Sequence, residues 1–268
     1  MTYAPLIEQT GWPSLYDVTD DWLLAPVSPR EAARLRRLDT MALARVDEVV
    51  VCSTALEKSR GRVRPVSRVP NGVDVDHFRR SRARPPDLGT APTAVYIGSL
   101  HDARLDVELV AELADALPQL NVVLVGPDSL GSASHSLLAS RPNVSLLGAR
   151  PYEDVPAYLQ HADVIVVPHR VTPFTDSLDP IKAYECLAID TPTVATPIAG
   201  FRIHADVLNV VDRDEFPARV SDILARGSGQ TRHTDAAVSW QDRVAMFESV
   251  LDRVVAPASA VTQSRPSA

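Results

Sequence analysis

The chain has 268 residues, of which 45% are hydrophobic and 23% charged, and its formal net charge is -7. These values are ordinary for a globular protein, and the negative charge argues against wholesale nucleic-acid binding, because phosphates would be repelled. Only two cysteines occur, Cys52 and Cys186, which favours a reduced, cytoplasmic protein. No apolar run approaches the roughly 20 residues that span a bilayer, and the first ten residues lack a signal-peptide pattern.

The first part of the chain predicts few strands. Ser28 and Pro29 mark the start of a helix, since serine caps free amides and proline is tolerated in the first turn. Ser53 is a second candidate cap for a short helix. The expected elements are strands at 15–18, 47–52 and 66–69, a helix at 29–45, and a turn at 70–74.

After an arginine- and proline-rich stretch, strand and helix patterns alternate. Several strands are continuous apolar runs, such as VVLV at 122–125 and VIVV at 164–167. Such strands are buried on both faces, which indicates a parallel sheet covered by helices. Strands are expected at 93–98, 121–126, 143–147, 163–167, 193–196 and 207–211, and helices at 105–117, 131–140, 152–161, from Pro180 to about 189, 215–225 and 240–255.

This alternation predicts an α/β fold with one complete Rossmann-like doubly wound parallel sheet of about six strands. The two or three earlier strands are too few for a second domain of the same kind. The expected organisation is a partial N-terminal α/β domain at 1–78, a linker at 79–92, the complete domain at 93–238, a C-terminal helix at 239–255, and a disordered tail at 256–268.

The most informative stretch is the start of the helix near Pro180. Asp179 is an expected N-cap and Pro180 the first helical residue, while Lys182 and Glu185 fall on one face. Free amides, a lysine and a glutamate one turn later can hold a phosphate and a sugar hydroxyl together. The stretch therefore indicates a nucleotide-sugar site, although Lys182 and Glu185 could also form an ordinary surface ion pair.

Several motifs in order carry a family resemblance: VPNGVD at 69–74, YIGSL at 96–100, VLVG at 123–126, VSLLG at 144–148, DPIKAYECLA at 179–188 and PTVAT at 192–196. Together they resemble the donor half of a GT-B glycosyltransferase, closest to the retaining, sucrose-synthase-like group 1 class that includes bacterial polysaccharide and cell-wall enzymes. The segment YDVTDDW at 16–22 resembles the late part of the acceptor domain in that class. The 1–78 region would then be acceptor-side, and the 93–238 domain would bind the nucleotide sugar.

The resemblance implies transfer of a hexose from a nucleoside diphosphate sugar, such as a UDP-sugar, with the anomeric configuration kept. Gly98 and Ser99 would approach the diphosphate, where the absence of a Cβ lets backbone come close. Arg104 would pair with the diphosphate, and Glu185 would accept from the ribose hydroxyls. The backbone of Ile181 and Lys182 would add amide contacts at the helix start opened by Asp179 and Pro180.

The loop at 148–152 would hold the nucleobase, with Arg150 and Tyr152 as weaker candidates. The first acid of the family's paired-glutamate motif would fall at Ser177, which is a departure from the pattern. His101 and His169 have no metal-ligand spacing, so no metal and no cofactor beyond the donor are expected. No catalytic residue is assigned, and Trp22 is expected to be core.

A GT-B enzyme has two comparable domains, and of the first domain this chain resembles only the later part, so the resemblance implies an N-terminally truncated form. The acceptor would be a polysaccharide, cell-wall, lipid-linked or natural-product molecule. A partner would supply the absent half, or the exposed edge of the partial sheet would promote self-association, and the resemblance also allows peripheral association with the inner face of the membrane. Two alternatives stay open: a fold-retaining nucleotide-sugar binder or scaffold without activity, and a UDP-sugar 2-epimerase.

Overall fold

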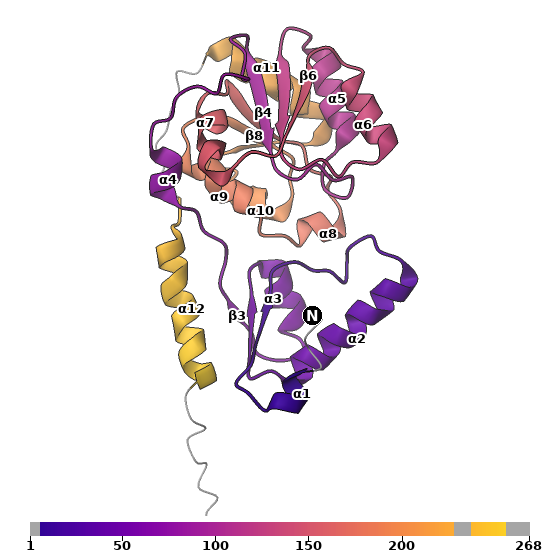
Figure 1. Ribbon diagram of the computed structural model, residues 1–268, viewed down its shortest axis with the longest axis vertical. Coiled ribbons are helices and arrows are strands. Elements are labelled where there is room, and N and C mark those ends of the chain that lie inside the picture. Colours follow the sequence, from indigo (N-terminus) through magenta and orange to yellow (C-terminus); the bar gives the residue numbers. More distant parts are fainter. Residues whose placement is uncertain (1–5, 228–236, 256–268) are drawn as a thin grey trace, which may run out of the picture.

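The computed structural model describes residues 6–227 and 237–255, so the tail expected at 256–268 lies outside the described residues. The chain forms two lobes (Figure 1). The N-terminal lobe contains a three-stranded sheet, and the C-terminal lobe contains a six-stranded sheet. Every strand pairing in both sheets is parallel.

The N-terminal lobe has the elements that its apolar and capping pattern predicted, together with a short first helix that was not predicted. Its strands are β1 (Leu15–Val18), β2 (Glu48–Val51) and β3 (Ser67–Arg68), and its helices are α1 (Leu6–Thr10), α2 (Pro29–Arg45) and α3 (Thr54–Arg60). Ser28 caps α2 by accepting from the Glu31 amide, and Ser53 caps α3 by accepting from the Leu56 amide. Both predicted caps are confirmed.

A small core and a buried ion pair hold this lobe together. Val49 and Val51 of β2 lie in one apolar cluster with Leu43 of α2 and Leu56 of α3. Next to this core, the Arg60 guanidinium donates to both carboxylate oxygens of Asp21, at 2.9 and 3.0 Å, and to Asp39 at 3.3 Å. All three side chains are almost fully buried. Removing the guanidinium would therefore leave two carboxylates without their counter-charge.

The C-terminal lobe is the doubly wound domain that the sequence predicted. Its sheet has the order β6-β5-β4-β7-β8-β9. The strands are β4 (Thr93–Ile97), β5 (Asn121–Val125), β6 (Val144–Gly148), β7 (Val164–Val167), β8 (Thr193–Ala195) and β9 (Asn209–Val210). β4 and β7 are buried along their whole length, as their uninterrupted apolar sequences require.

Helices cover both faces of this sheet (Figure 1). Helices α5 and α6 lie together on one side, and α7 and α9 lie on the other with α4. The helices are α4 (Val75–Arg79), α5 (Val107–Ala116), α6 (Ser132–Ala139), η1 (Tyr152–Asp154), α7 (Val155–Gln160), α8 (Pro173–Asp176), α9 (Ile181–Ala188), α10 (Ala199–Arg202), η2 (Arg213–Glu215) and α11 (Phe216–Arg226).

The stretch expected to be a linker, 79–92, is packed against the C-terminal lobe. After Arg79 it contains no helix or strand, yet Leu88 is only 2% exposed. Asp87 forms a 2.7 Å ion pair with Arg150, and the Arg82 amide donates to the Gln160 side chain. These contacts fix the segment on the lobe, so it does not act as a free spacer.

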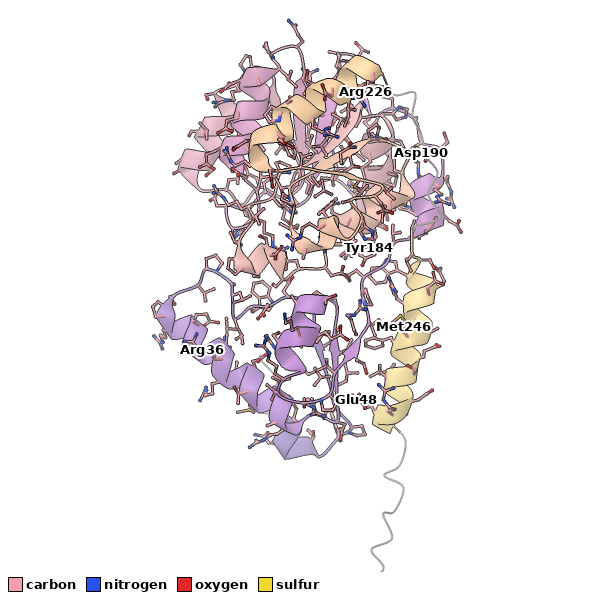
Figure 2. All side chains as sticks on the ribbon, turned by 180° about the vertical axis from the view of Figure 1, so that it is seen from behind. Arg36, Glu48, Tyr184, Asp190, Arg226 and Met246 are labelled. Atoms are coloured by element: carbon pink, nitrogen blue, oxygen red, sulfur yellow. The ribbon has the colours of Figure 1, made fainter. Side chains whose placement is uncertain are left out.

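The chain returns to the N-terminal lobe through α12 (Trp240–Val255), which begins at the residue predicted from the sequence. At the crossing, Val73 donates to the Val238 carbonyl at 3.1 Å and accepts from the Trp240 amide at 3.2 Å. α12 then runs along the N-terminal lobe beside β2 (Figure 2). Near its end, Arg253 pairs with Glu48 at 3.0 Å.

Candidate functional site

A pocket of about 360 Å³ lies between the two lobes, and we call it the interlobe pocket. It is placed at the carboxyl ends of β4 and β7, where the strand order of the large sheet reverses. Ligands of open α/β sheets bind at this switch point. The pocket is lined by Gly98, Ser99, Arg104, Asp179, Pro180, Ile181 and Lys182 from the predicted set, and by Thr19, Asp20, Asn71, Tyr96, Ile97, His169 and Leu178.

The turn after β4 requires glycine because backbone and ring atoms crowd it. The Gly98 amide donates to the Val125 carbonyl at 2.9 Å. A Cβ on Gly98 would lie 2.8 Å from the Tyr96 hydroxyl, and one on Gly126 would lie 1.9 Å from the Gly98 carbonyl oxygen. Real Cβ atoms do not make such contacts, so both glycines let the two strand ends meet beneath the pocket.

Arg104 lies where the sequence predicted a phosphate contact, but it is engaged with the opposite lobe. Its guanidinium is 3.4 Å from the Asp20 carboxylate and stacks over the Phe174 ring at 5.5 Å from the centroid. Phe174 contacts Trp22 at a centroid distance of 5.9 Å. Trp22 is 43% exposed, so its prediction as a core residue is wrong, since it lies at the contact between the lobes.

The start of α9 differs from the prediction in one respect. Pro180, not Asp179, occupies the N-cap position, and no side chain caps the first-turn amides. The Asp179 carboxylate instead accepts from the Asn71 amide at 2.6 Å and from the Tyr184 hydroxyl at 2.8 Å. Burial raises the pKa of this carboxyl. The amides of Ile181 and Lys182 are therefore left for an anion at the positive end of the helix.

Lys182 and Glu185 form an ion pair one helical turn apart, as their spacing predicted. Lys182 lines the interlobe pocket, and Glu185 lies just beyond it with its side chain only 9% exposed. A carboxylate this buried is held by its lysine and has few rotamers open to it. It therefore presents its remaining lone pairs in a fixed direction, as binding a pair of hydroxyl groups requires.

Besides Glu185, two predicted residues, Arg150 and Tyr152, lie outside the pocket lining. The Arg150 guanidinium donates to the Tyr158 hydroxyl at 2.9 Å, to the Leu147 carbonyl at 2.6 Å and to Asp87. The side chain thus binds the segment at 79–92 to the C-terminal lobe. The half-exposed Tyr152 stacks on His77, with ring centroids 4.5 Å apart and planes at 11°. The negative charge of Glu185 contributes, after burial, to the raised pKa of Tyr152. A role for either residue in base binding stays a prediction.

Sequence reasoning did not assign His169 and Tyr96, a polar pair in the pocket lining. His169 follows β7 and is 8% exposed, with its Nε2 3.3 Å from the Tyr96 hydroxyl and its Nδ1 unpartnered. Burial, reinforced by the charges of Arg104 and Lys182, lowers the pKa of His169 to about 4. The ring is therefore neutral at pH 7. Its position at the end of a buried strand was the available signal for its place in the site.

No group of three or more His, Cys, Asp or Glu side chains within residues 6–227 and 237–255 could hold a metal ion. That the reaction needs no metal stays a prediction from the sequence.

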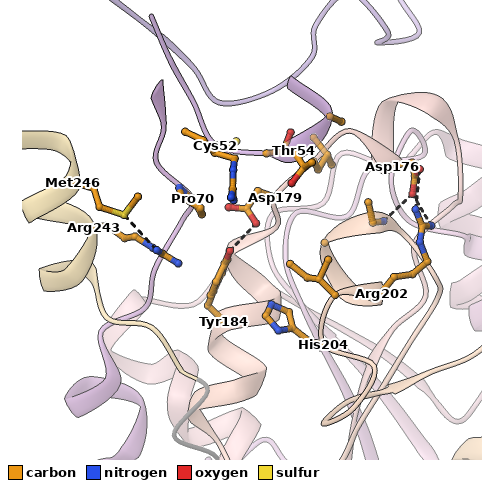
Figure 3. A pocket seen from close by; sticks show the side chains of 17 residues that line it. Cys52, Thr54, Pro70, Asp176, Asp179, Tyr184, Arg202, His204, Arg243 and Met246 are labelled. Carbon is orange, nitrogen blue, oxygen red and sulfur yellow. Dashed lines mark hydrogen bonds and ion pairs between the residues drawn. The ribbon is translucent and has the colours of Figure 1, made fainter. Parts of the chain in front are cut away.

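A second cavity of about 560 Å³ (Figure 3) shares Leu178 and Asp179 with the lining of the interlobe pocket. Asp179 and Tyr184 meet at its centre, and Asp176 pairs with Arg202 at its side, at 2.8 Å. A Cβ on Gly200 would lie 2.2 Å from Cδ of Pro180. Gly200 thus lets α10 press directly against the start of α9, which fixes one wall of the interlobe pocket.

Sequence comparison places the C-terminal lobe among known transferases. The family model for glycosyl transferases group 1 matches residues 91–226. A Bacillus subtilis (strain 168) protein, TuaH, is 28% identical over 199 residues, which are 68% of this chain and 50% of that protein. Its name, a teichuronic acid biosynthesis glycosyltransferase, is itself a provisional assignment. The chain spans about half the length of this curated relative.

Solved structures share the fold of both lobes. Sucrose-phosphate synthase from Thermosynechococcus elongatus matches with a TM-score of 0.71 and 20% identity, over 93% of this chain and 70% of that one. Anabaena HepE, in complex with UDP-glucose, matches with a TM-score of 0.65 and 15% identity, over 89% and 71%. These likenesses confirm the predicted GT-B type α/β fold. Among the described helices, none is both long and apolar enough to cross a bilayer.

Proposed function

Since the chain belongs to the family of group 1 glycosyl transferases, we propose that it binds a nucleoside diphosphate sugar in the interlobe pocket for transfer of the sugar to an acceptor. The observation that supports this proposal is the convergence of three features in that pocket. The Gly98 turn, the Arg104 guanidinium and the uncapped start of α9 come from separate parts of the sequence and line one space.

In the proposed complex, the diphosphate lies between the Gly98–Ser99 backbone, Arg104 and the α9 amides. The ribose hydroxyls donate to Glu185, and Lys182 lies between the two groups. Lys182, which pairs with Glu185 and lines the interlobe pocket, is the proposed second cation for the diphosphate. Cationic groups and helix amides are the contacts that phosphates use most often in proteins.

We propose a UDP-sugar as the first donor to test. Anabaena HepE was crystallised with UDP-glucose, and the trehalose-phosphate synthase from Burkholderia vietnamiensis, which is UDP-forming, has a TM-score of 0.62 to this chain. TuaH takes its name from teichuronic acid, a polymer, which supports a polysaccharide acceptor. Retention of the anomeric configuration is proposed from the resemblance to the sucrose-synthase-like class.

The chemistry follows from where charge develops. Cleavage of the bond between the anomeric carbon and the diphosphate leaves negative charge on the phosphate oxygens and positive character on the sugar. Arg104, Lys182 and the first-turn amides of α9 stabilise that leaving group, and their geometry is set before the reaction begins. Loss of one charged contact should cost roughly 1.5–3 kcal/mol, which is about ten- to a hundred-fold in rate or affinity.

A second candidate is a binder of nucleotide sugars that does not transfer them. The Ser177 side chain favours it, because its buried hydroxyl donates to the Phe174 carbonyl and supplies no carboxylate to the sugar. The two candidates differ in one measurement. A transferase consumes UDP-glucose in the presence of acceptor polysaccharide, whereas a binder saturates with the same ligand and leaves it intact.

Calorimetric titration with UDP- and GDP-sugars tests the proposal. We expect saturable binding of at least one nucleotide sugar, and we expect Glu185→Gln to weaken it at least tenfold, because a neutral amide replaces the acceptor carboxylate. Glu215→Gln is the matched control, since this exposed η2 residue lies outside the pocket lining. Absence of saturation with every nucleotide sugar at millimolar concentration would exclude the proposed function.

A further inference from the structure

The interlobe pocket contains a carboxylate on the wall that faces the phosphate contacts. Asp20 follows β1 in the N-terminal lobe, and its Oδ2 is 3.4 Å from Nη2 of Arg104. The two side chains are only 24% and 38% exposed. Arg104 is also held over Phe174, which contacts Trp22, two residues after Asp20. The predicted phosphate-binding arginine is thus bound to the opposite lobe.

A negative charge at this position conflicts with binding of a diphosphate. A guanidinium that binds phosphate with two parallel hydrogen bonds cannot give the same donors to Asp20. The Asp20 carboxylate would also repel an anion that reaches Arg104, and the repulsion grows in proportion to the charge of the anion. Asp20 therefore acts against the ligand that Arg104, Lys182 and α9 attract.

The size of this effect depends on which ligand is bound. In a nucleotide sugar, the second phosphate is esterified by the sugar and carries one negative charge. In a free nucleoside diphosphate that phosphate is terminal, and with a second pKa near 6 it carries almost two charges at pH 7.5. The Asp20 carboxylate therefore repels the nucleoside diphosphate product more strongly than it repels the nucleotide-sugar donor.

We propose that Asp20 is a selectivity residue, which holds Arg104 while the pocket is empty and disfavours a free nucleoside diphosphate more than a nucleotide sugar. This inference rests on the proposed function, because it requires the diphosphate to lie at Arg104. It assigns Asp20 a part in releasing the product after transfer. It also gives an acidic residue of the acceptor-side lobe a direct effect on the donor site.

The test is calorimetric titration of UDP and UDP-glucose into the wild-type chain and Asp20→Asn at pH 7.5 and low salt. We expect the variant to bind UDP more tightly, and the ratio of the two dissociation constants to shift toward UDP by about three- to tenfold. Asp20→Ser should give the same shift, so that a folding defect in one variant does not decide the outcome. Asp222→Asn, an exposed α11 position with the same charge change, should leave the ratio unaltered.

A further variant separates competition for Arg104 from plain repulsion. In an Arg104→Gln background, the gain from Asp20→Asn should shrink, because only direct repulsion remains. If the wild type binds both ligands but Asp20→Asn weakens UDP binding or leaves the ratio unchanged, the inference is wrong and the proposed function stands. If the wild type and every variant fail to bind either ligand, the proposed function itself is wrong.

Discussion

Replacement of Gly200 by alanine should disturb the donor site from outside the pocket. The new Cβ would lie 2.2 Å from Cδ of Pro180 and 3.2 Å from the Leu178 carbonyl oxygen. Ordinary carbon–carbon contact is about 3.5 Å, so Pro180 and the start of α9 must move by about 1 Å. Overpacking of this kind costs roughly 1–3 kcal/mol, and the higher helix propensity of alanine in α10 returns at most about 1 kcal/mol.

We therefore expect Gly200→Ala to lower the free energy of unfolding by about 0.5–2 kcal/mol and to weaken nucleotide-sugar binding about tenfold. Binding suffers because the first-turn amides of α9 move with Pro180. Urea unfolding and calorimetric titration measure the two effects. Gly89→Ala is the matched control, since its Cβ would meet only the Asn121 side chain, at 3.7 Å. Unchanged stability and affinity in Gly200→Ala would refute the argument that this contact fixes the pocket wall.

Three further predictions concern the charged groups. Arg60→Met should destabilise the N-terminal lobe by roughly 3–5 kcal/mol, because Asp21 and Asp39 stay buried without their partner. Urea unfolding monitored by tryptophan fluorescence would detect the lower stability, and a loss under about 1 kcal/mol would contradict the prediction. The pKa of His169 is about 4 in the folded chain, below the value near 6.5 expected in the unfolded chain. Its contribution to stability is therefore present above pH 6.5, and roughly 3 kcal/mol is lost as the pH falls toward 4. His169→Gln should make the urea unfolding midpoint less dependent on pH over that range, and a pH profile equal to that of the wild type would argue against a buried neutral ring. Arg104→Gln should weaken UDP-glucose binding by about ten- to a hundred-fold, and calorimetry that shows equal affinity would remove Arg104 from the site.

Local sequence signals predicted the elements whose ends are set by local chemistry. α2 starts at Pro29 as expected, because the Ser28 cap and the proline act on their own turn. The apolar run of β7 predicted burial on both faces, since nothing polar along it could face water. The start of α9 was predicted wrongly, because the Asp179 carboxylate is bound by Asn71, which lies 108 positions earlier in the sequence.

The same distinction applies to the candidate site. The glycine turn and the helix start follow from strand-to-helix connections, so Gly98 and Lys182 could be placed from sequence order. Asp20 reaches the pocket only because the two lobes pack against each other. The ion pair between Arg150 and Asp87 of the segment at 79–92 could not be read from the order of the motifs. Contacts between distant segments decide such cases, and one sequence does not display them.

The crossing of the two chain segments between the lobes has a mechanical consequence. Val73 is bonded to Val238 and Trp240 at a single point, and a Cβ on Gly72 would come within 3.0 Å of the Ser239 carbonyl. A shift of one connecting segment along the other would break both hydrogen bonds. The two crossing segments are thus fastened to each other rather than running as separate tethers, and the amides of Val73 and Trp240 should exchange hydrogen slowly.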